Sequence, residues 1–220
     1  MTIRLPSNRR CSSVGGRRFD TEQLYAGVVP RLEPTTVAKQ LLADELPERW
    51  LHVQGVGMKA VDLAPLLGSG QTQLLVDAAV LHDVGYSSQI RDTGFHPIDG
   101  ARHLRRGGFD ERIVNLVAHH TCARVEAGLR GLGHILDDEF PKDHALPHPE
   151  LCYCDLTVNP IGEVVTVDER LADIRHRYGI GHVVHDFVDQ AEPELRRSVA
   201  DVEERMNAQP RYGESPSWAK

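Results

Sequence analysis

Residues 71–85 read QTQLLVDAAVLHDVG, an apolar segment that ends in a histidine and an aspartate. Its apolar residues recur at spacings of three and four, which is typical of a helix with a buried face, and Gly85 is placed to end that helix. His82 and Asp83 are therefore expected at the C-terminal end of a buried helix. A buried carboxylate without a partner costs several kcal/mol, and a bound cation would offset that cost.

Further histidines and one late aspartate lie on separate segments that are otherwise apolar or amphipathic: His52, His96, His119, His120 and Asp155. Imidazole nitrogens and carboxylate oxygens are ligands for borderline and hard divalent metals. The chain holds 12 histidines, so any one of them could be an ordinary packed residue. Several apolar segments that each bring His or Asp inward predict a metal centre.

The hydrophobic pattern around these residues is helical almost throughout. Gly55 and Gly57 weaken the prediction of one unbroken helix over residues 48–67. Residues 159–167 favour a turn and a short strand. The sequence therefore predicts an all-α helical bundle with at most a minor short β element. Helices are expected over residues 37–46, 48–67, 71–85, 96–108, 110–121, 168–179 and 184–208, and a short apolar element over 149–158.

Composition divides the chain into three parts. Residues 1–34 are rich in Arg, Ser, Gly and Pro and are predicted to form a variable, partly ordered N-terminal arm. Residues 35–180 should form a metal-binding helical domain, since the chain is long enough to bury a sizeable core. Residues 181–220 should form a C-terminal helix and tail packed on the same domain.

The net charge of -7 argues against partners that need a basic surface, namely extended nucleic acid and membranes. No apolar run approaches the ~18 to 20 residues of a membrane-spanning helix, and the Arg-rich start lacks the apolar region of a secretory signal. A cytoplasmic protein is expected, and its oligomeric state stays open.

The ligand candidates as a set resemble the HD-domain superfamily of helical, metal-dependent phosphohydrolases. The resemblance lies in RWLH, which ends at His52, in His82 and Asp83 of LLVDAAVLHDVG, and in Asp155 of LCYCDLTV. Family members often have an arginine three residues before the first histidine, as Arg49 is here. The resemblance implies that these three segments hold a first metal ion, and that Asp83 bridges to a second.

Two more histidine positions match the dinuclear branch of this superfamily, which includes bacterial diadenosine-tetraphosphate hydrolases and HD-GYP phosphodiesterases. They are His96 in FHPIDGA and one histidine of VAHHT. His120 is preferred because HHT resembles the His-Thr of the hydrolases, and His119 stays an alternative. The resemblance covers roughly residues 35–180 and implies one or two divalent ions, with two favoured, drawn from Fe, Mn, Co, Ni, Zn or Mg.

The sequence departs from the family pattern at two places. Many members continue the doublet as HD-x-x-K, whereas Tyr86 stands at the lysine position here. No GYP motif follows His120, so the specificity for cyclic dinucleotides does not carry over. The departure at Tyr86 removes one expected phosphate contact.

Metal-activated water would be the nucleophile of a phosphohydrolase, with Asp83 and Lys59 as the catalytic candidates. Lys59 lies two helical turns after His52 and so on roughly the same face. Glu48, one turn before His52, is either an outer ligand or an ordinary first-turn acid. Other charged residues could act at the centre or could be ordinary surface, turn or helix-start residues. Those that could neutralise charge are Arg91, Arg102, Arg105 and Arg124, and those that could orient imidazoles are Asp92 and Asp99.

Three functions remain open from the sequence. The first is a metal-dependent phosphohydrolase that acts on a small phosphorylated substrate, a nucleotide or a related phosphoester. The second is an HD-type di-iron oxygenase, which uses a similar set of six ligands. The third is a non-catalytic, metal-stabilised module that binds a ligand or regulates, because a fold and a bound ion do not by themselves prove turnover.

Overall fold

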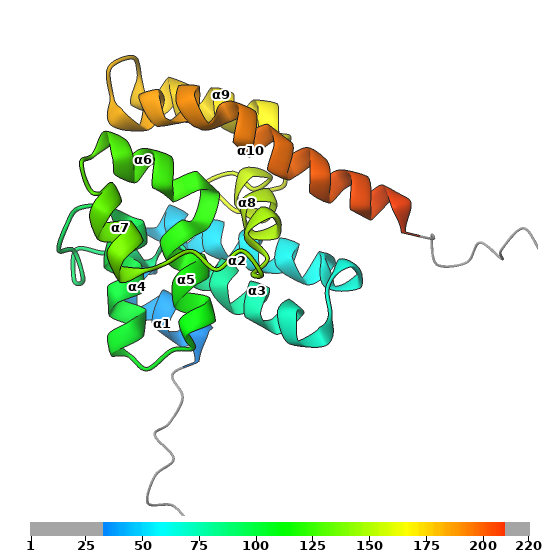
Figure 1. The fold of residues 1–220 in the computed structure, drawn as a ribbon, viewed down its shortest axis with the longest axis horizontal. Coiled ribbons are helices and arrows are strands. Elements are labelled where there is room, and N and C mark those ends of the chain that lie inside the picture. The colour runs from blue at the N-terminus through cyan, green and yellow to red at the C-terminus, as the bar shows by residue number, and fades with distance from the viewer. Residues whose placement is uncertain (1–32, 210–220) are drawn as a thin grey trace, which may run out of the picture. The chain divides into compact units, whose positions relative to one another are not determined.

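A computed structural model describes residues 33–209, which fold as a bundle of α-helices (Figure 1). The predicted arm over residues 1–34 lies almost wholly outside the described residues, as does the tail from 210. The described α-helices are α1 (Pro34–Leu42), α2 (Pro47–Asp62), α3 (Ser69–Leu81), α4 (His96–Arg106), α5 (Glu111–His119), α6 (Ala123–Leu129), α7 (Gly133–Glu139), α8 (His148–Leu156), α9 (Val167–Tyr178) and α10 (Val183–Ala208).

The helix starts follow local sequence signals. Pro47 occupies the first turn of α2, where a missing N–H costs nothing. The Asp110 side chain accepts a hydrogen bond from the backbone of Arg112 at the start of α5. Thr166 and Glu169 form a reciprocal capping box at the start of α9. These signals fix where α2, α5 and α9 begin.

Helix α3 is the centre of the bundle. It contacts α1, α2, α5 and α8, and Leu75, Ala78, Ala79 and Leu81 on it are fully buried. A helix with so little polar surface is stable only when neighbours cover it on several sides. The other helices therefore surround the segment that ends in His82, and the all-α prediction is confirmed.

Helix α2 is continuous across Gly55 and Gly57, contrary to the break that these residues suggested. A Cβ on Gly55 would lie 2.6 Å from the backbone oxygen of Gly162, and one on Gly57 would lie 2.7 Å from Cγ2 of Val80. The two glycines are thus points where neighbouring segments approach the helix closely. The helix ends at Asp62, earlier than predicted, and a 3-10 turn follows it over Ala64–Leu66.

The minor β element is a single antiparallel bridge between Val158 and Val164, and residues 33–209 contain no longer strand. The short helices α6 and α7 were not predicted. Glycines at 128, 131 and 133 interrupt their sequences, which conceals a helical period, and α6 contacts α7, α10 and the turn after α5. Packing rather than local preference therefore sets these two helices.

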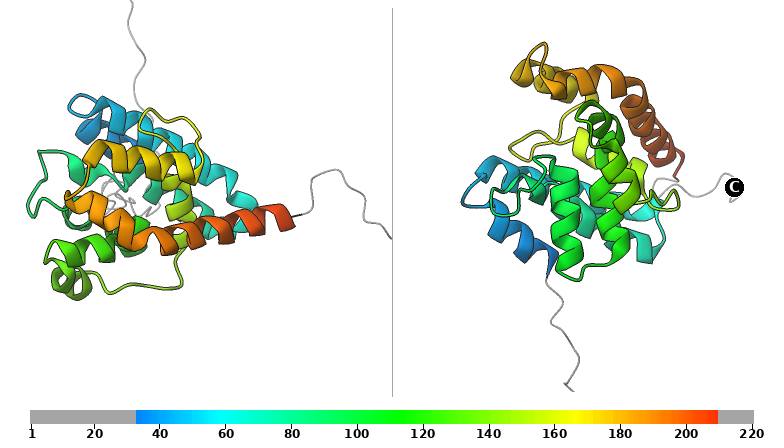
Figure 2. Two further views of the ribbon diagram at one scale, coloured as in Figure 1. Left: turned by 90° about the horizontal axis from the view of Figure 1, so that it is seen from above. Right: turned by 60° about the vertical axis from the view of Figure 1, so that its left-hand side comes forward.

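Helices α9 and α10 pack side by side along one side of the bundle (Figure 2). Helix α10 also contacts α8 and α6, so it covers the part of the bundle that carries Asp155. None of the helices over residues 33–209 is long and apolar enough to cross a membrane.

We predict that Gly85→Ala destabilises the protein and disturbs the start of α4. A Cβ on Gly85 would lie 1.9 Å from the backbone oxygen of His96 and 2.7 Å from the nitrogen of Gly100, and backbone atoms cannot move aside cheaply. The free energy of unfolding should fall by about 2 to 3 kcal/mol in denaturant titrations. Gly70→Ala is the matched control, because its Cβ meets nothing within 4 Å. Equal stabilities of the two variants would contradict this account of the turn.

Candidate metal centre

Six of the predicted ligands converge in the interior of the bundle. His52 comes from α2, His82 and Asp83 follow α3, His96 opens α4, His120 follows α5, and Asp155 lies on α8. All of them are buried except His96, whose side chain is 12% exposed. Five segments that are far apart in the sequence thus place ligand atoms around one point.

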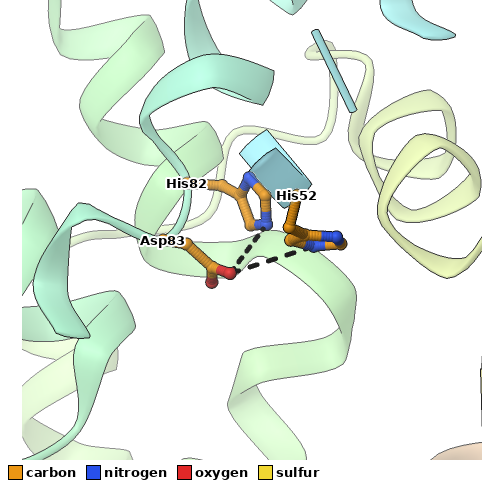
Figure 3. A group of neighbouring side chains, drawn as sticks. All are labelled: His52, His82 and Asp83. Atoms are coloured by element: carbon orange, nitrogen blue, oxygen red, sulfur yellow. Dashed lines mark ion pairs between the residues drawn. The ribbon is translucent and has the colours of Figure 1, made fainter. Parts of the chain in front are cut away.

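Asp83 lies between two pairs of histidines. Its Oδ2 is 3.4 Å from Nε2 of His82 and 3.9 Å from Nε2 of His52, and these contacts are drawn in Figure 3. Its Oδ1 is 3.5 Å from Nε2 of His96 and 4.0 Å from Nε2 of His120. The two oxygens of one carboxylate therefore face two separate groups, each able to hold a metal ion: His52, His82 and Asp83, and Asp83, His96 and His120.

Asp155 completes the first group. Its Oδ1 lies 3.1 Å from Nε2 of His52 and 3.8 Å from Nε2 of His82. Its Oδ2 accepts a hydrogen bond of 2.5 Å from the hydroxyl of Thr121, so one oxygen is held while the other faces the histidines. Thr121 has a left-handed backbone (φ 46), an uncommon conformation for a β-branched residue.

Backbone carbonyls fix the orientation of three imidazoles. In each ring Nδ1 lies within hydrogen-bond distance of a carbonyl oxygen and donates to it, so Nε2 is the nitrogen directed at the centre. This is the usual arrangement of a metal-binding histidine. The pairs are His52 with Asn159 at 3.0 Å, His82 with Ala79 at 2.7 Å, and His120 with Val117 at 2.6 Å.

The imidazole nitrogens that face the centre are placed better for binding a metal than for hydrogen bonding to one another. Nε2 of His82 is buried and has no hydrogen-bond partner among the described residues. Nε2 of His96 lies 3.0 Å from Nε2 of His120, so two ring nitrogens of the same type face each other. Lone pairs in this arrangement repel unless a cation or a proton lies between them. Divalent ions would satisfy all of these atoms.

The carboxylates of the centre are ionised and its imidazoles are mostly neutral. Burial opposes the charge on Asp83, but the charge of Arg49 and then that of His82 hold its pKa well below the usual range. Burial lowers the pKa of His96 and His120. Burial would lower the pKa of His82 too, but Asp83 and then Asp155 raise it to about 9. His82 is thus the ring that is protonated on both nitrogens, and so positively charged, at neutral pH.

The structure does not bring His119 to the centre. Its Nε2 donates to the backbone oxygen of Phe140 at 2.5 Å, and its ring packs edge-on against His148. The residue belongs to the last turn of α5, whereas His120 follows the helix with an extended backbone, so adjacent side chains point in different directions. The structure therefore favours His120 of the two.

Lys59 also lies away from the centre, contrary to its predicted catalytic role. Its Nζ is 5.2 Å from the centre of the Tyr153 ring, and it does not line the cavity beside the histidines. Seven residues on a helix return to the same face, but they also span about 10 Å along the axis. That axial distance is the reason the spacing rule failed here.

Arg49 and Tyr86 form one side of the centre. Nη1 of Arg49 donates to Oδ2 of Asp83 at 2.6 Å, and its guanidinium lies 4.0 Å from the centre of the Tyr86 ring. The imidazole of His96 stacks on the same ring at 3.9 Å. Two groups so close to the ring occupy opposite faces, so Tyr86 lies between them. The residue that replaces the family lysine thus supports a ligand.

The remaining charged candidates form contacts away from the metal ligands. Asp99 accepts hydrogen bonds from the Thr93 and Gly94 backbones, and so stabilises the turn before α4. Glu48 lines a hollow beside Arg49 and His52. The arginines have other partners: Arg91 contacts the backbone oxygen of Tyr86, Arg102 pairs with Asp92 and Glu139, Arg105 with Glu111, and Arg124 with Asp137.

The site includes residues that sequence reasoning missed. Thr121 is the first, and its position directly after His120 was the available signal. Arg170 is the second, with Nη2 3.7 Å from Oδ1 of Asp155. It lies on α9, outside any motif, and only the fold brings it to the centre.

Comparison with known families agrees with this geometry. A family model described as the HD domain matches residues 49–156, the segment that runs from Arg49 through Asp155. Residues 49–156 are therefore an HD domain, the helical fold of a superfamily whose members are mostly metal-dependent hydrolases. No curated protein and no solved structure matched the chain.

Replacing each of the adjacent histidines should separate a ligand from its neighbour. His120→Ala removes a donor of the second group and should lower the bound metal by about one ion per chain. His119→Ala removes a side chain that contacts Phe140, and it should keep the metal content of the wild type. Elemental analysis after dialysis measures both, with thermal melts to show that each variant is folded. Loss of metal from His119→Ala alone would contradict the assignment.

Metal binding should release a proton at neutral pH. Because the pKa of His82 is about 9 without metal, the ring is protonated at pH 7.5 and must lose that proton to bind an ion. Calorimetry in buffers of different ionisation enthalpy should therefore detect about one proton released, and the apparent affinity should rise about tenfold per pH unit until pH approaches 9. An affinity that is constant between pH 7 and 9 would contradict the charge state given to His82.

Proposed function

We propose that this protein is a metal-dependent phosphohydrolase that acts on a small phosphorylated compound, a nucleotide or a related phosphoester. The observation that carries the proposal is the Asp83 carboxylate with one oxygen toward His52 and His82 and the other toward His96 and His120. This arrangement suits two ions that share one bridging ligand. Membership of the HD-domain superfamily supports the same reaction class.

Two bound divalent ions would supply an activated water and stabilise negative charge on phosphoryl oxygens. The imidazole-rich set favours Fe, Mn, Co, Ni or Zn over Mg, which prefers oxygen ligands. His52, His82, Asp83 and Asp155 would hold one ion, and Asp83, His96 and His120 the other. The carbonyls behind the rings keep the ligands in place before substrate arrives.

The chain's own residues would prepare the reaction in three ways. The hydrogen bond from Arg49 keeps Asp83 ionised and oriented. Thr121 holds one oxygen of Asp155, so that the other stays directed at the histidines. The burial of the centre limits access of bulk water and strengthens electrostatic interactions within it.

A cavity opens directly onto the centre and gives substrate a place to bind. Asp83, His96, His120 and Asp155 line one end of it, together with Arg49. The ligands are therefore not sealed in the core as they are in a purely structural metal site. An anionic substrate could reach them from this side.

Tyr86 favours a second candidate, a di-iron oxygenase built on the same ligands. An amine at its position would offer a charged contact to phosphate, whereas the Tyr86 ring is stacked between Arg49 and His96. Uptake of oxygen by the reduced, iron-loaded protein with candidate phosphonates would support this alternative. Hydrolysis of phosphoesters without oxygen would exclude it as the main activity.

Activity should depend on Asp83 and not on Lys59. Asp83→Asn keeps the shape of the side chain but removes the charge shared by both groups, so phosphate release should fall by about 10³-fold or more. Lys59→Met removes a charge on the same helix as His52 but outside the cavity, and should keep activity within about twofold of the wild type. The assay is release of phosphate or nucleotide from a substrate panel with each metal in turn. Equal activity of wild type and Asp83→Asn would contradict the proposal, as would no release with any metal.

A further inference from the structure

The cavity beside the metal centre extends beyond the HD domain to α9 and α10. Helix α9 lines it with Arg170, Ile174, Arg177 and Tyr178. Their spacing of four, three and one places all four on one face of the helix. A segment outside residues 49–156 therefore presents a continuous face of two arginines, an isoleucine and a tyrosine to the space above the metal ligands.

Arg170 is a buried cation with few partners. It is 5% exposed, and its Nε has no hydrogen-bond partner among the described residues. Nη2 lies 3.7 Å from Oδ1 of Asp155, and Nη1 lies 3.5 Å from Oδ2 of Asp173, both long for ion pairs. A guanidinium has five N–H donors, and its burial is costly unless they are used. Such an arginine is suited to receive an anion.

The nearby carboxylates do not neutralise this face. Oδ2 of Asp173 lies 2.8 Å from Nη2 of Arg177, so Arg170 and Arg177 share one carboxylate. Asp155 is the other acidic neighbour of Arg170, and its charge would mainly neutralise a bound metal ion. The two guanidinium groups therefore keep a positive charge toward the cavity. Paired arginines match the oxygens of a phosphoryl group well, and Nε of Arg170 has no protein partner among the described residues.

Another part of the cavity lining is apolar. Helix α10 contributes Val184, Phe187, Val188 and Leu195, and Ile174 of α9 adjoins them. These residues carry no group that could hydrogen-bond a sugar or a second phosphate. The cavity lining thus combines two cationic side chains with a group of apolar side chains.

We propose that Arg170 and Arg177 bind the charged oxygens of a phosphoryl or phosphonyl group and that α10 packs against an apolar or aromatic substituent of the same molecule. The substrate class is then an aryl or alkyl phosphoester or phosphonate. This assignment rests on the proposed function, since the metal centre is the place where the phosphorus would react. Under this proposal, residues of α9 and α10, which lie outside the HD domain, determine the specificity of the site.

Binding of phenylphosphonate to the full-length, metal-loaded protein tests the assignment without turnover by a hydrolase. Isothermal titration calorimetry should show that phenylphosphonate binds about tenfold or more tightly than inorganic phosphate, because the phenyl ring reaches the apolar side chains. Arg170→Met should weaken phenylphosphonate binding by about 10- to 100-fold, the range for losing a hydrogen bond to a charged group. Arg170→Lys should recover only part of that loss.

Arg112→Met is the matched control. Arg112 pairs with Asp110 at the surface and lies outside the cavity, and its replacement changes the net charge by the same amount. Its affinity for phenylphosphonate should stay within about twofold of the wild type. Metal content and thermal melts establish that Arg170→Met is folded and loaded. If it is not, Arg177→Met, which changes the other arginine that lines the cavity, serves instead and should weaken binding about tenfold.

Wild-type affinity in the folded arginine variant would overturn the proposal, and equal binding of phosphate and phenylphosphonate would overturn the apolar part of it. Hydrolysis assays distinguish failure of this binding site from failure of the proposed hydrolase function. If arginine-dependent binding persists while no phosphoester is hydrolysed, the site stands and the hydrolase fails. If hydrolysis persists while binding ignores Arg170 and Arg177, the hydrolase stands and this site fails.

Discussion

The carboxylate of Asp83 is the group on which the rest of the centre depends. It is buried at the end of the central helix, and its two oxygens face two pairs of imidazoles that come from four different segments. A buried charge is tolerated only when it is paired or bound to a metal. Arg49 and the proton on His82 provide this compensation without metal, and bound ions would take over part of that role.

The bundle can be understood as a scaffold for that carboxylate. Helix α3 is covered on several sides, which fixes the position of its C-terminal end. Gly55 and Gly85 let other backbones approach the ligand-bearing segments closely. Backbone carbonyls then orient the rings of His52, His82 and His120. Rigid elements with a supporting shell hold ligands more accurately than mobile loops would.

The sequence predicted the helical fold and most of the candidate site, because periodic apolar residues and inward histidines leave a local pattern. It failed where position depends on distance along a helix or on distant segments. Lys59 is on the expected face of α2 but too far along its axis, and the last turn of α5 directs His119 elsewhere. Arg170 reaches Asp155 only through the packing of α9 on the bundle, so no local sequence pattern predicted its place in the site.

The central claim is that Asp83 is shared between two metal ions, and anomalous diffraction from crystals of the manganese-loaded protein measures this most directly. The account predicts two anomalous peaks about 3.5–4 Å apart, one on each side of Asp83, with one oxygen of the carboxylate toward each peak. His52, His82 and Asp155 should surround the first peak, and His96 and His120 the second. A single peak, or two peaks that do not share Asp83, would contradict the account.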